Sequence, residues 1–275
     1  MDLYLFLKAV IVGLVEGATE FIPVSSTGHI LIVQNWLGMT GEKWYAFGIF
    51  IQLGAILAVI WMYRQKIWDV LRTWRDPKSR RLMINLVIAS IPAAVIGLPT
   101  NDWVEANLSG VLTIAAALVV GGIAILLVER YFQKPTIDSV DDIPYSKALW
   151  VGFFQVLAML WPGISRSGAT IMGGLGLGLS RTAATEFSFF LAIPAMFGAS
   201  LVKMSDIVDV ATAADVPVFA VGFIVAFASA LVVIRALLAY VSKNTFKPFA
   251  YYRIIFGLIL IAWYWGSGGG AGVAG

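Results

Sequence analysis

Long apolar segments dominate this chain of 275 residues. Charged side chains make up only 13% of it, against about 25% in an ordinary soluble domain, so a water-soluble fold is excluded. Backbone amides in lipid must be satisfied internally, which leaves helices as the spanning structure for segments of this kind. We therefore predict an all-α integral membrane protein that forms a single membrane domain over residues 1–275. The apolar segments cover residues 3–36, 46–63, 82–98, 110–128, 147–179, 185–202, 218–240 and 249–265.

Two of these segments, 3–36 and 147–179, are too long for one simple span and are polar in the middle. Pro23 breaks the first at its polar centre, and Pro162 followed by Gly163 breaks the second. Irregular backbone at membrane depth is tolerated only where it is buried in protein or faces water. We predict that each segment forms a re-entrant hairpin, in which two half-helices enter and leave on the same side.

The same order of segments occurs twice along the chain. A shift of 139 residues places Pro23 on Pro162 and Ser26 on Ser165, which indicates a duplication. Each repeat would hold one re-entrant hairpin and three transmembrane helices. Because three is odd, the second repeat starts on the opposite side, which predicts the inverted-topology repeat common in secondary transporters. The repeats would cover residues of about 3–130 and 147–266.

Loop charges predict the orientation in the membrane. Loop 64–81 carries seven Lys and Arg residues, so the positive-inside rule places it in the cytoplasm. Counting spans from there puts loops 129–146 and 242–248 in the cytoplasm as well, and both contain basic residues. Loops 100–109 and 203–217 fall outside and are mostly acidic. Both termini are then expected on the outer face.

The polar centre of the first hairpin, 16–29, combines carboxylates, hydroxyls and the only histidine of the chain. Glu16 and Glu20 are four residues apart and would share a helix face, where they could hold a divalent cation or supply a general base. They could equally be a structural pair satisfied by buried partners. His29 could act as nucleophile or as general acid and base. Hydroxyls at a helix start can cap free amides or line an anion site, and these are Ser25, Ser26 and Thr27.

The polar centre of the second hairpin, 162–170, adds a cation. Arg166 offers the forked donor geometry that suits phosphate oxygens, although it could also be a mere ion-pair partner for Glu16 or Glu20. Ionisable groups at membrane depth mark function by default. We predict that the two polar centres meet inside the membrane and build one phosphate-handling site. Further hydroxyls in the second stretch are Ser165, Ser167 and Thr170.

The two polar stretches also carry a family resemblance. Glu-Gly-Ala-Thr-Glu-Phe-Ile-Pro-Val-Ser-Ser-Thr-Gly-His (16–29) and Pro-Gly-Ile-Ser-Arg-Ser-Gly-Ala-Thr (162–170) closely resemble the signature motifs of the bacterial undecaprenyl-diphosphate phosphatases, or bacitracin-resistance proteins. The resemblance covers essentially the whole chain apart from the glycine-rich tail. It implies hydrolysis of undecaprenyl diphosphate to the monophosphate and phosphate, with Mg2+ or Ca2+, which recycles the lipid carrier of cell-wall synthesis. It also implies the bacterial cytoplasmic (inner) membrane, with the active site opening to the outer, periplasmic face.

Carrying the family motifs over residue by residue implies roles for individual side chains. Catalytic roles are expected of Glu16, Glu20, Ser26, His29 and Arg166, with Glu16 and Glu20 as the metal ligands. Together with the helix-start argument, phosphate binding is expected of Ser25, Thr27, Ser165, Arg166, Ser167 and Thr170.

Three questions stay open at the level of sequence. The nucleophile is Ser26, His29 or an activated water, and we favour Ser26. The competing function is a transporter or flippase for a lipid-linked phosphate or another anion, because the predicted architecture is itself typical of transporters. The expected partners are undecaprenyl diphosphate and membrane lipid, with no nucleic acid, and a homodimer is the open alternative to a monomer.

Overall fold

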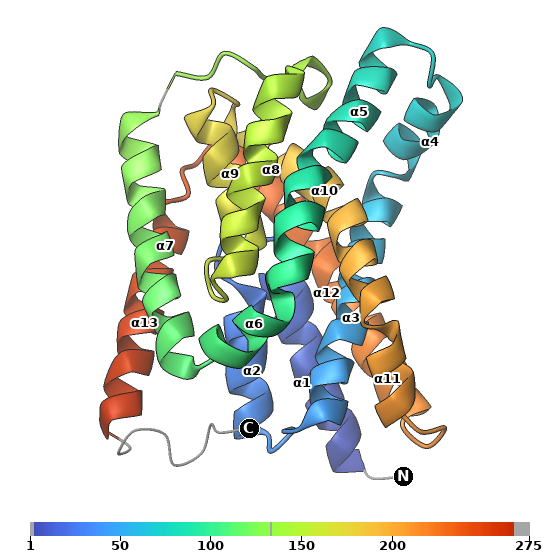
Figure 1. Cartoon of the computed structure of the whole chain (residues 1–275), viewed down its shortest axis with the longest axis vertical. Coiled ribbons are helices and arrows are strands. Elements are labelled where there is room, and N and C mark those ends of the chain that lie inside the picture. Colours follow the sequence, from blue (N-terminus) through green and yellow to red (C-terminus); the bar gives the residue numbers. More distant parts are fainter. Residues whose placement is uncertain (1–2, 133, 267–275) are drawn as a thin grey trace.

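The predicted all-α class is confirmed. The computed structural model describes residues 3–132 and 134–266, and the regular elements in those residues are helices (Figure 1). Within the same residues, six helices are long and apolar enough to cross a bilayer, so the chain is a multi-pass membrane protein. The helices are α1 Leu3–Thr19, α2 Ser26–Trp36, α3 Glu42–Met62, α4 Arg64–Arg72, α5 Pro77–Pro92, η1 Ala93–Gly97, α6 Leu98–Leu108, α7 Val111–Tyr131, η2 Val140–Asp142, α8 Tyr145–Leu160, α9 Arg166–Gly176, α10 Arg181–Val202, α11 Met204–Val210, α12 Val216–Val241 and α13 Lys247–Gly266.

Two broken helices lie where the sequence predicts them. The first hairpin is α1, of 17 residues, followed by α2, of 11, and the second is α8, of 16, followed by α9, of 11. At 1.5 Å per residue, each half-helix is at most about 25 Å long, short of the roughly 30 Å apolar layer of a bilayer. In Figure 1, α1 and α2 lie in the lower half of the molecule, and α8 and α9 lie in the upper half. The tips of both hairpins therefore end inside the bundle.

The elements of the two halves follow one another at nearly constant spacing, but the turns differ in length. Glu42 and Arg181, which begin α3 and α10, are 139 residues apart. Ser25 and Ser165 cap α2 and α9 in the same conformation and are 140 apart, so the predicted match of Ser26 with Ser165 is wrong by one position. Between the proline and the N-cap serine, the second turn has two residues, Gly163 and Ile164, where the first has only Val24. The inverted symmetry of the two halves stays a prediction.

Some stretches that were expected to be loops are helical. Residues 77–108 form one continuous run, in which α5 passes through the π-helical turn η1 into α6. Pro92 lacks the amide that would continue the α-helical ladder, and such interruptions are frequent sites of π-helical geometry. The predicted outer loop 100–109 is therefore mostly α6. The basic loop 64–81 contains α4, and the outer loop 203–217 contains α11.

Ion pairs and hydrogen bonds join the loops that were predicted to share a side. Lys66 lies 2.9 Å from Asp141, which links the basic loop 64–81 to loop 129–146. At the other end of the bundle, Lys203 lies 3.3 Å from Glu105 and links α10 to α6. The relative placement of these loops is confirmed. Which end faces the cytoplasm stays a prediction.

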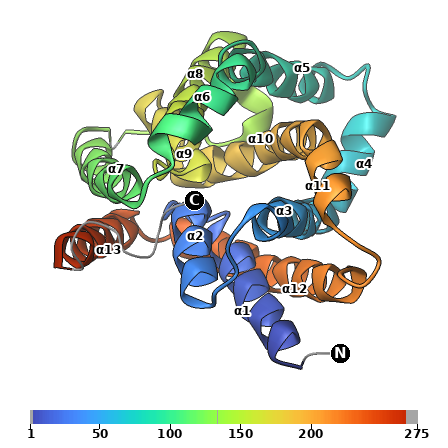
Figure 2. The same ribbon diagram turned by 60° about the horizontal axis from the view of Figure 1, so that its bottom comes forward.

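The two halves are interlocked rather than side by side. α1 packs along α12, and α7 packs along α13, so the first and last parts of the chain are neighbours. In Figure 2, α10 runs through the middle of the bundle, with α8 and α9 on one side and α3 on the other. The buried surface of α10 forms much of the main core, through residues such as Phe187, Phe189 and Leu191. This central helix is what the tip of each hairpin lies against.

Candidate functional site

The first turns of α2 and α9 are built in the same way. Ser25 and Ser165 are the N-cap residues, and their φ angles of 73° and 74° lie in a region that residues other than glycine rarely adopt. The Ser25 hydroxyl accepts a hydrogen bond from the Gly28 amide at 3.5 Å, and Ser165 accepts one from the Gly168 amide at 3.1 Å. Such backbone strain persists only where the surroundings enforce it and is common at functional sites.

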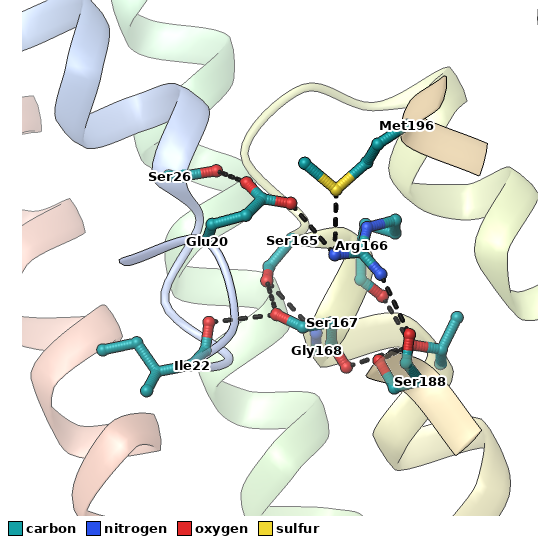
Figure 3. Close-up of polar contacts among 10 residues, drawn as sticks. Glu20, Ile22, Ser26, Ser165, Arg166, Ser167, Gly168, Ser188 and Met196 are labelled. Atoms are coloured by element: carbon teal, nitrogen blue, oxygen red, sulfur yellow. Dashed lines mark hydrogen bonds and ion pairs between the residues drawn. The ribbon is translucent and has the colours of Figure 1, made fainter. Parts of the chain in front are cut away.

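The residue after each cap reaches the same carboxylate. Ser26 donates a hydrogen bond to Oε2 of Glu20, and Arg166 Nη2 lies 3.0 Å from Oε1 of Glu20 (Figure 3). Arg166 also donates to the Ser188 carbonyl at 3.2 Å and approaches the Met196 sulfur at 3.7 Å, both on α10. The side chains of Glu20 and Arg166 are only 8% and 15% exposed. The two hairpins therefore meet, as predicted, at a buried ion pair.

The remaining hydroxyls of the second hairpin hold the hairpins together. Ser167 donates to the Ile22 carbonyl of the first turn at 3.0 Å (Figure 3). The Ser165 and Ser167 oxygens are 3.1 Å apart, and Thr170 donates to the Arg166 carbonyl at 2.9 Å. These contacts set the position of the α9 N-terminus relative to Glu20. The predicted phosphate-binding roles of these hydroxyls stay predictions.

Glu16 lies one turn before Glu20, at 1% exposure. In residues 3–132 and 134–266, its Oε1 atom has no hydrogen-bond partner, which is unusual for a buried carboxylate. A divalent cation bound by carboxylate oxygens would satisfy this atom. No group of three His, Asp or Glu side chains suited to a metal occurs in the same residues, so a cation here would need further oxygens from substrate or water. Binding of Mg2+ or Ca2+ by Glu16 and Glu20 stays a prediction.

His29 lies apart from the Glu20 cluster. Its Nδ1 lies 2.7 Å from the Ser25 carbonyl and its Nε2 lies 2.6 Å from the Tyr252 hydroxyl. A carbonyl can only accept, so Nδ1 carries the proton and, in the neutral ring, Nε2 accepts from Tyr252. The ring is stacked against Tyr252 and Phe256, with centroids 5.6 and 4.7 Å away. Both nitrogens are thus engaged.

Thr27 and three unpredicted residues complete the description of the site. Thr27 is exposed and, among the described residues, makes no hydrogen bond to the Glu20 cluster, so its phosphate-binding role stays a prediction. Sequence reasoning missed Tyr252, Arg253 and Ser188. A signal was available for Arg253, because it is a basic residue in the middle of the apolar segment 249–265.

The geometry is that of an anion site with an adjacent base. Two helix N-termini, each with positive dipole and free amides, point at one region. Arg166 lies there, and Ser26 is hydrogen-bonded to the carboxylate of Glu20. A hydroxyl bonded to a carboxylate is the arrangement of an activated nucleophile. That this arrangement binds and attacks a phosphate group stays a prediction.

A family model described as bacitracin resistance protein BacA matches residues 9–259. The chain belongs to the BacA family. Three curated relatives agree with this. An undecaprenyl-diphosphatase of Pseudomonas putida (strain F1) is 48% identical over 97% of both chains. An undecaprenyl-diphosphatase 1 of Pseudomonas fluorescens (strain Pf0-1) is 49% identical over 97% of both chains. An undecaprenyl-diphosphatase of Methylobacillus flagellatus is 48% identical over 96% of this chain and 100% of its own.

The BacA match contains the whole site. It begins within α1 before Glu16 and ends within α13 after Phe256. Both hairpins, the central helix α10 and the α13 residues around His29 lie inside it. The site is therefore part of the family's common region rather than an addition to it.

Proposed function

We propose that this chain hydrolyses undecaprenyl diphosphate to undecaprenyl phosphate and inorganic phosphate, and so recycles the lipid carrier of cell-wall synthesis. Three relatives that match 96–97% of the chain carry the name undecaprenyl-diphosphatase or undecaprenyl-diphosphatase 1. The single structural observation that carries the proposal is the Glu20 carboxylate, bonded to Ser26 from one hairpin and to Arg166 from the other. It supports the proposal because Ser26 as nucleophile, Glu20 as base and Arg166 as phosphate ligand would then belong to one cluster.

Binding would begin with exchange of partners at Arg166. The terminal phosphate replaces Glu20 as the partner of the Arg166 guanidinium. The amides at the starts of α2 and α9 bind further phosphate oxygens. Phosphoryl transfer depends mainly on positioning and on neutralising charge. Arg166 is well placed for this, because α10 fixes it through the Ser188 carbonyl.

The chemical step that fits this geometry uses Ser26. Its oxygen attacks the terminal phosphorus, and its proton passes to Glu20. The bond between that phosphorus and the bridging oxygen breaks, and undecaprenyl phosphate leaves. The proton on Glu20 passes to the leaving oxygen of undecaprenyl phosphate, which restores the carboxylate. Glu20 then deprotonates a water that attacks the phosphorus of the phosphoserine, and the proton passes to the Ser26 oxygen as phosphate leaves. His29 is the weaker candidate for nucleophile, because the Ser25 carbonyl and the Tyr252 hydroxyl occupy both its nitrogens.

Metal binding is part of the proposal. Glu16 and Glu20 would hold Mg2+ or Ca2+, and the Oε1 atom of Glu16, which has no partner among the described residues, supports this. A bound divalent cation would neutralise charge on the diphosphate. We also propose the bacterial inner membrane with the termini and the site opening on the outer face, since loop 64–81 is strongly basic. A homodimer stays a prediction.

The test is phosphate release from undecaprenyl diphosphate by the purified protein in detergent, with Mg2+, with Ca2+ and with EDTA. We expect release that depends on the cation and that Arg166→Ala abolishes. Arg235→Ala is the matched control, because Arg235 is exposed on α12 and should keep the wild-type rate. Detergent removes the sealed compartment that transport needs, so absence of release by folded protein would favour the transporter alternative.

A further inference from the structure

Arg253 is fully buried in the middle of α13, at 0% exposure. Its guanidinium binds backbone carbonyls and nothing else that the described residues offer within hydrogen-bond distance. Every one of its three nitrogens is used. The acceptors are Leu118 (3.3 Å, from Nε), Pro23 and Ile164 (3.0 and 2.8 Å, from Nη1), and Ala117 and Gly163 (3.1 and 2.9 Å, from Nη2).

These acceptors come from three separate places in the fold. Pro23 lies in the turn of the first hairpin, and Gly163 and Ile164 lie in the turn of the second. The other two belong to α7. Carbonyls in a non-helical turn at membrane depth need a partner, and one side chain supplies it to both turns. Nη1 alone is shared between Pro23 and Ile164, so a single nitrogen sets how far apart the two turns lie.

The charge of Arg253 is not neutralised by an acid. Among the described residues, no carboxylate forms an ion pair with it, and only carbonyl dipoles surround it. A buried charge without an acidic partner is expensive unless hydrogen bonds compensate it. The guanidinium contacts carbonyls of the two turns that lead into α2 and α9. It therefore adds positive potential where an anionic group would bind.

We propose that Arg253 is a positioning residue for phosphate-ester chemistry at the Glu20 cluster. It fixes the spacing of the two hairpin turns, so that Ser26 and Arg166 reach the same carboxylate, and its charge favours the bound diphosphate. The expected effect of Arg253 on the rate of phosphate release rests on the proposed function. The structural part of the inference, the spacing of the turns, stands independently.

Gly121 on α7 makes a second variant possible. A Cβ atom built on Gly121 would lie 2.1 Å from Nη2 of Arg253, so Gly121→Ala displaces the guanidinium while its charge remains. Gly110 is the matched control, because a Cβ there meets no atom closer than 4.0 Å. Arg253→Lys retains the charge and loses the forked donor. Arg253→Met loses both.

The kinetic test measures kcat and KM for undecaprenyl diphosphate in detergent with each folded variant. Misplacement of reacting groups by about 1 Å costs on the order of 100-fold, so we expect kcat to fall by that order in Arg253→Lys and Gly121→Ala, with KM nearly unchanged. Arg253→Met should also raise KM, because the charge is gone. Wild-type kcat in folded Arg253→Lys and Gly121→Ala, or an equal loss in Gly110→Ala, would overturn the proposal.

A distance measurement tests the spacing without activity. The chain has no cysteine, so spin labels can be placed uniquely at Thr27 and Leu157, which are exposed on the first and second hairpins. We expect one narrow distance distribution in the wild type and in Gly110→Ala, and a broadened one in Gly121→Ala and Arg253→Lys. Unbroadened distributions in both variants would refute the positioning role. Failure of the wild type to release phosphate would instead refute the proposed function and leave this measurement intact.

Discussion

The contacts of His29 favour one of the chemical roles that its imidazole ring could have. The ring donates a hydrogen bond to the Ser25 carbonyl and accepts one from the Tyr252 hydroxyl. It is also stacked on Tyr252 and Phe256. A nucleophilic nitrogen needs a free lone pair, and here the lone pair of Nε2 is occupied. His29 is better placed to orient the start of α2, which carries Ser26, than to receive a phosphoryl group.

Tyr252→Phe tests that role, because it keeps the stacked ring and removes only the hydrogen bond to His29. A neutral hydrogen bond contributes about 1 kcal/mol, so we expect roughly a fivefold fall in the rate of phosphate release at saturating lipid. Tyr251→Phe is the control, since Tyr251 is 54% exposed, and it should retain the wild-type rate. An unchanged rate for Tyr252→Phe would exclude the His29–Tyr252 contact from the mechanism.

Single residues were predictable only where the motif itself contained the chemistry. Glu20 and Arg166 could be expected to meet, because a buried carboxylate and a buried guanidinium each require a partner and both flank a helix break. Tyr252 could not be found from sequence, since it lies 223 residues from His29 and no spacing rule links them. Arg253 could have been found, because a lone cation in an apolar span is a functional signal in itself.

Among the elements, Glu129 joins α7 to α10 and to Phe246, the residue just before α13. This carboxylate is 1% exposed and accepts from Arg181 at 3.0 and 2.5 Å and from the Phe246 amide at 2.8 Å. The bidentate geometry makes the contact strong and directional. The contacts of Glu129 involve none of the residues of the Glu20 cluster.

Glu129→Gln should therefore affect stability rather than chemistry. Removing one partner of a buried pair costs roughly 3 kcal/mol, which would appear in SDS-titrated unfolding in mixed micelles. The Lys66–Asp141 pair is 32% and 26% exposed, so Asp141→Asn should cost only about 0–1 kcal/mol. Equal losses in the two variants, or loss of kcat in Glu129→Gln, would contradict this assignment.

A second contact between elements depends on pH. Lys43 at the start of α3 lies 2.9 Å from Asp215, just before α12. The hydrogen bond from Lys43, with two more from Thr212, lowers the pKa of Asp215 from 3.8 to about 2. Because the folded pKa is depressed, this stabilisation is complete above about pH 4 and is lost as the pH falls toward about 2.

Asp215→Asn should accordingly lower the apparent midpoint of thermal unfolding in detergent at pH 7. The difference from the wild type should shrink as the pH falls from about 4 to about 2, where the wild-type carboxyl is protonated as well. Glu105→Gln, which removes a more exposed pair, is the comparison. A difference that stayed constant from pH 7 to pH 2 would show that the ion pair is not its cause.

Element boundaries were predictable where a residue type enforces them. Pro23 and Pro162 lie in the two turns, as expected from the broken apolar segments. The π-helical turn η1 was not predicted, because a proline such as Pro92 can either end a helix or interrupt it, and the surrounding packing decides which. Met159 of α8 lies so close to Gly97 that an added Cβ would come within 2.2 Å of it. The one-residue error in the repeat register arose between the proline and the N-cap serine, where the second turn has one residue more than the first.

For the whole molecule, the arrangement of the loops makes a clear topological prediction. Contacts join the basic loop 64–81 to loop 129–146, and join α6 to α10 at the opposite end. Cysteines introduced at Arg80 and at Ala106, both exposed, should react with an impermeant maleimide differently in intact cells. We expect Ala106→Cys to be labelled from outside and Arg80→Cys only after permeabilisation. The reverse pattern would invert the proposed orientation, and labelling of both would reject it.

The packing of α1 against α12 and of α7 against α13 has a consequence for the biosynthesis of the protein. α1 ends at Thr19 and α12 begins at Val216, so on the order of 200 residues are made in between, about 10 to 40 s of synthesis. During that interval the first hairpin, with Glu16 and Glu20, is in the membrane without α12, against which α1 packs. Its turn also waits for Arg253, which arrives later still. A newly made chain can therefore complete the site only after α13, its last helix, has been synthesised.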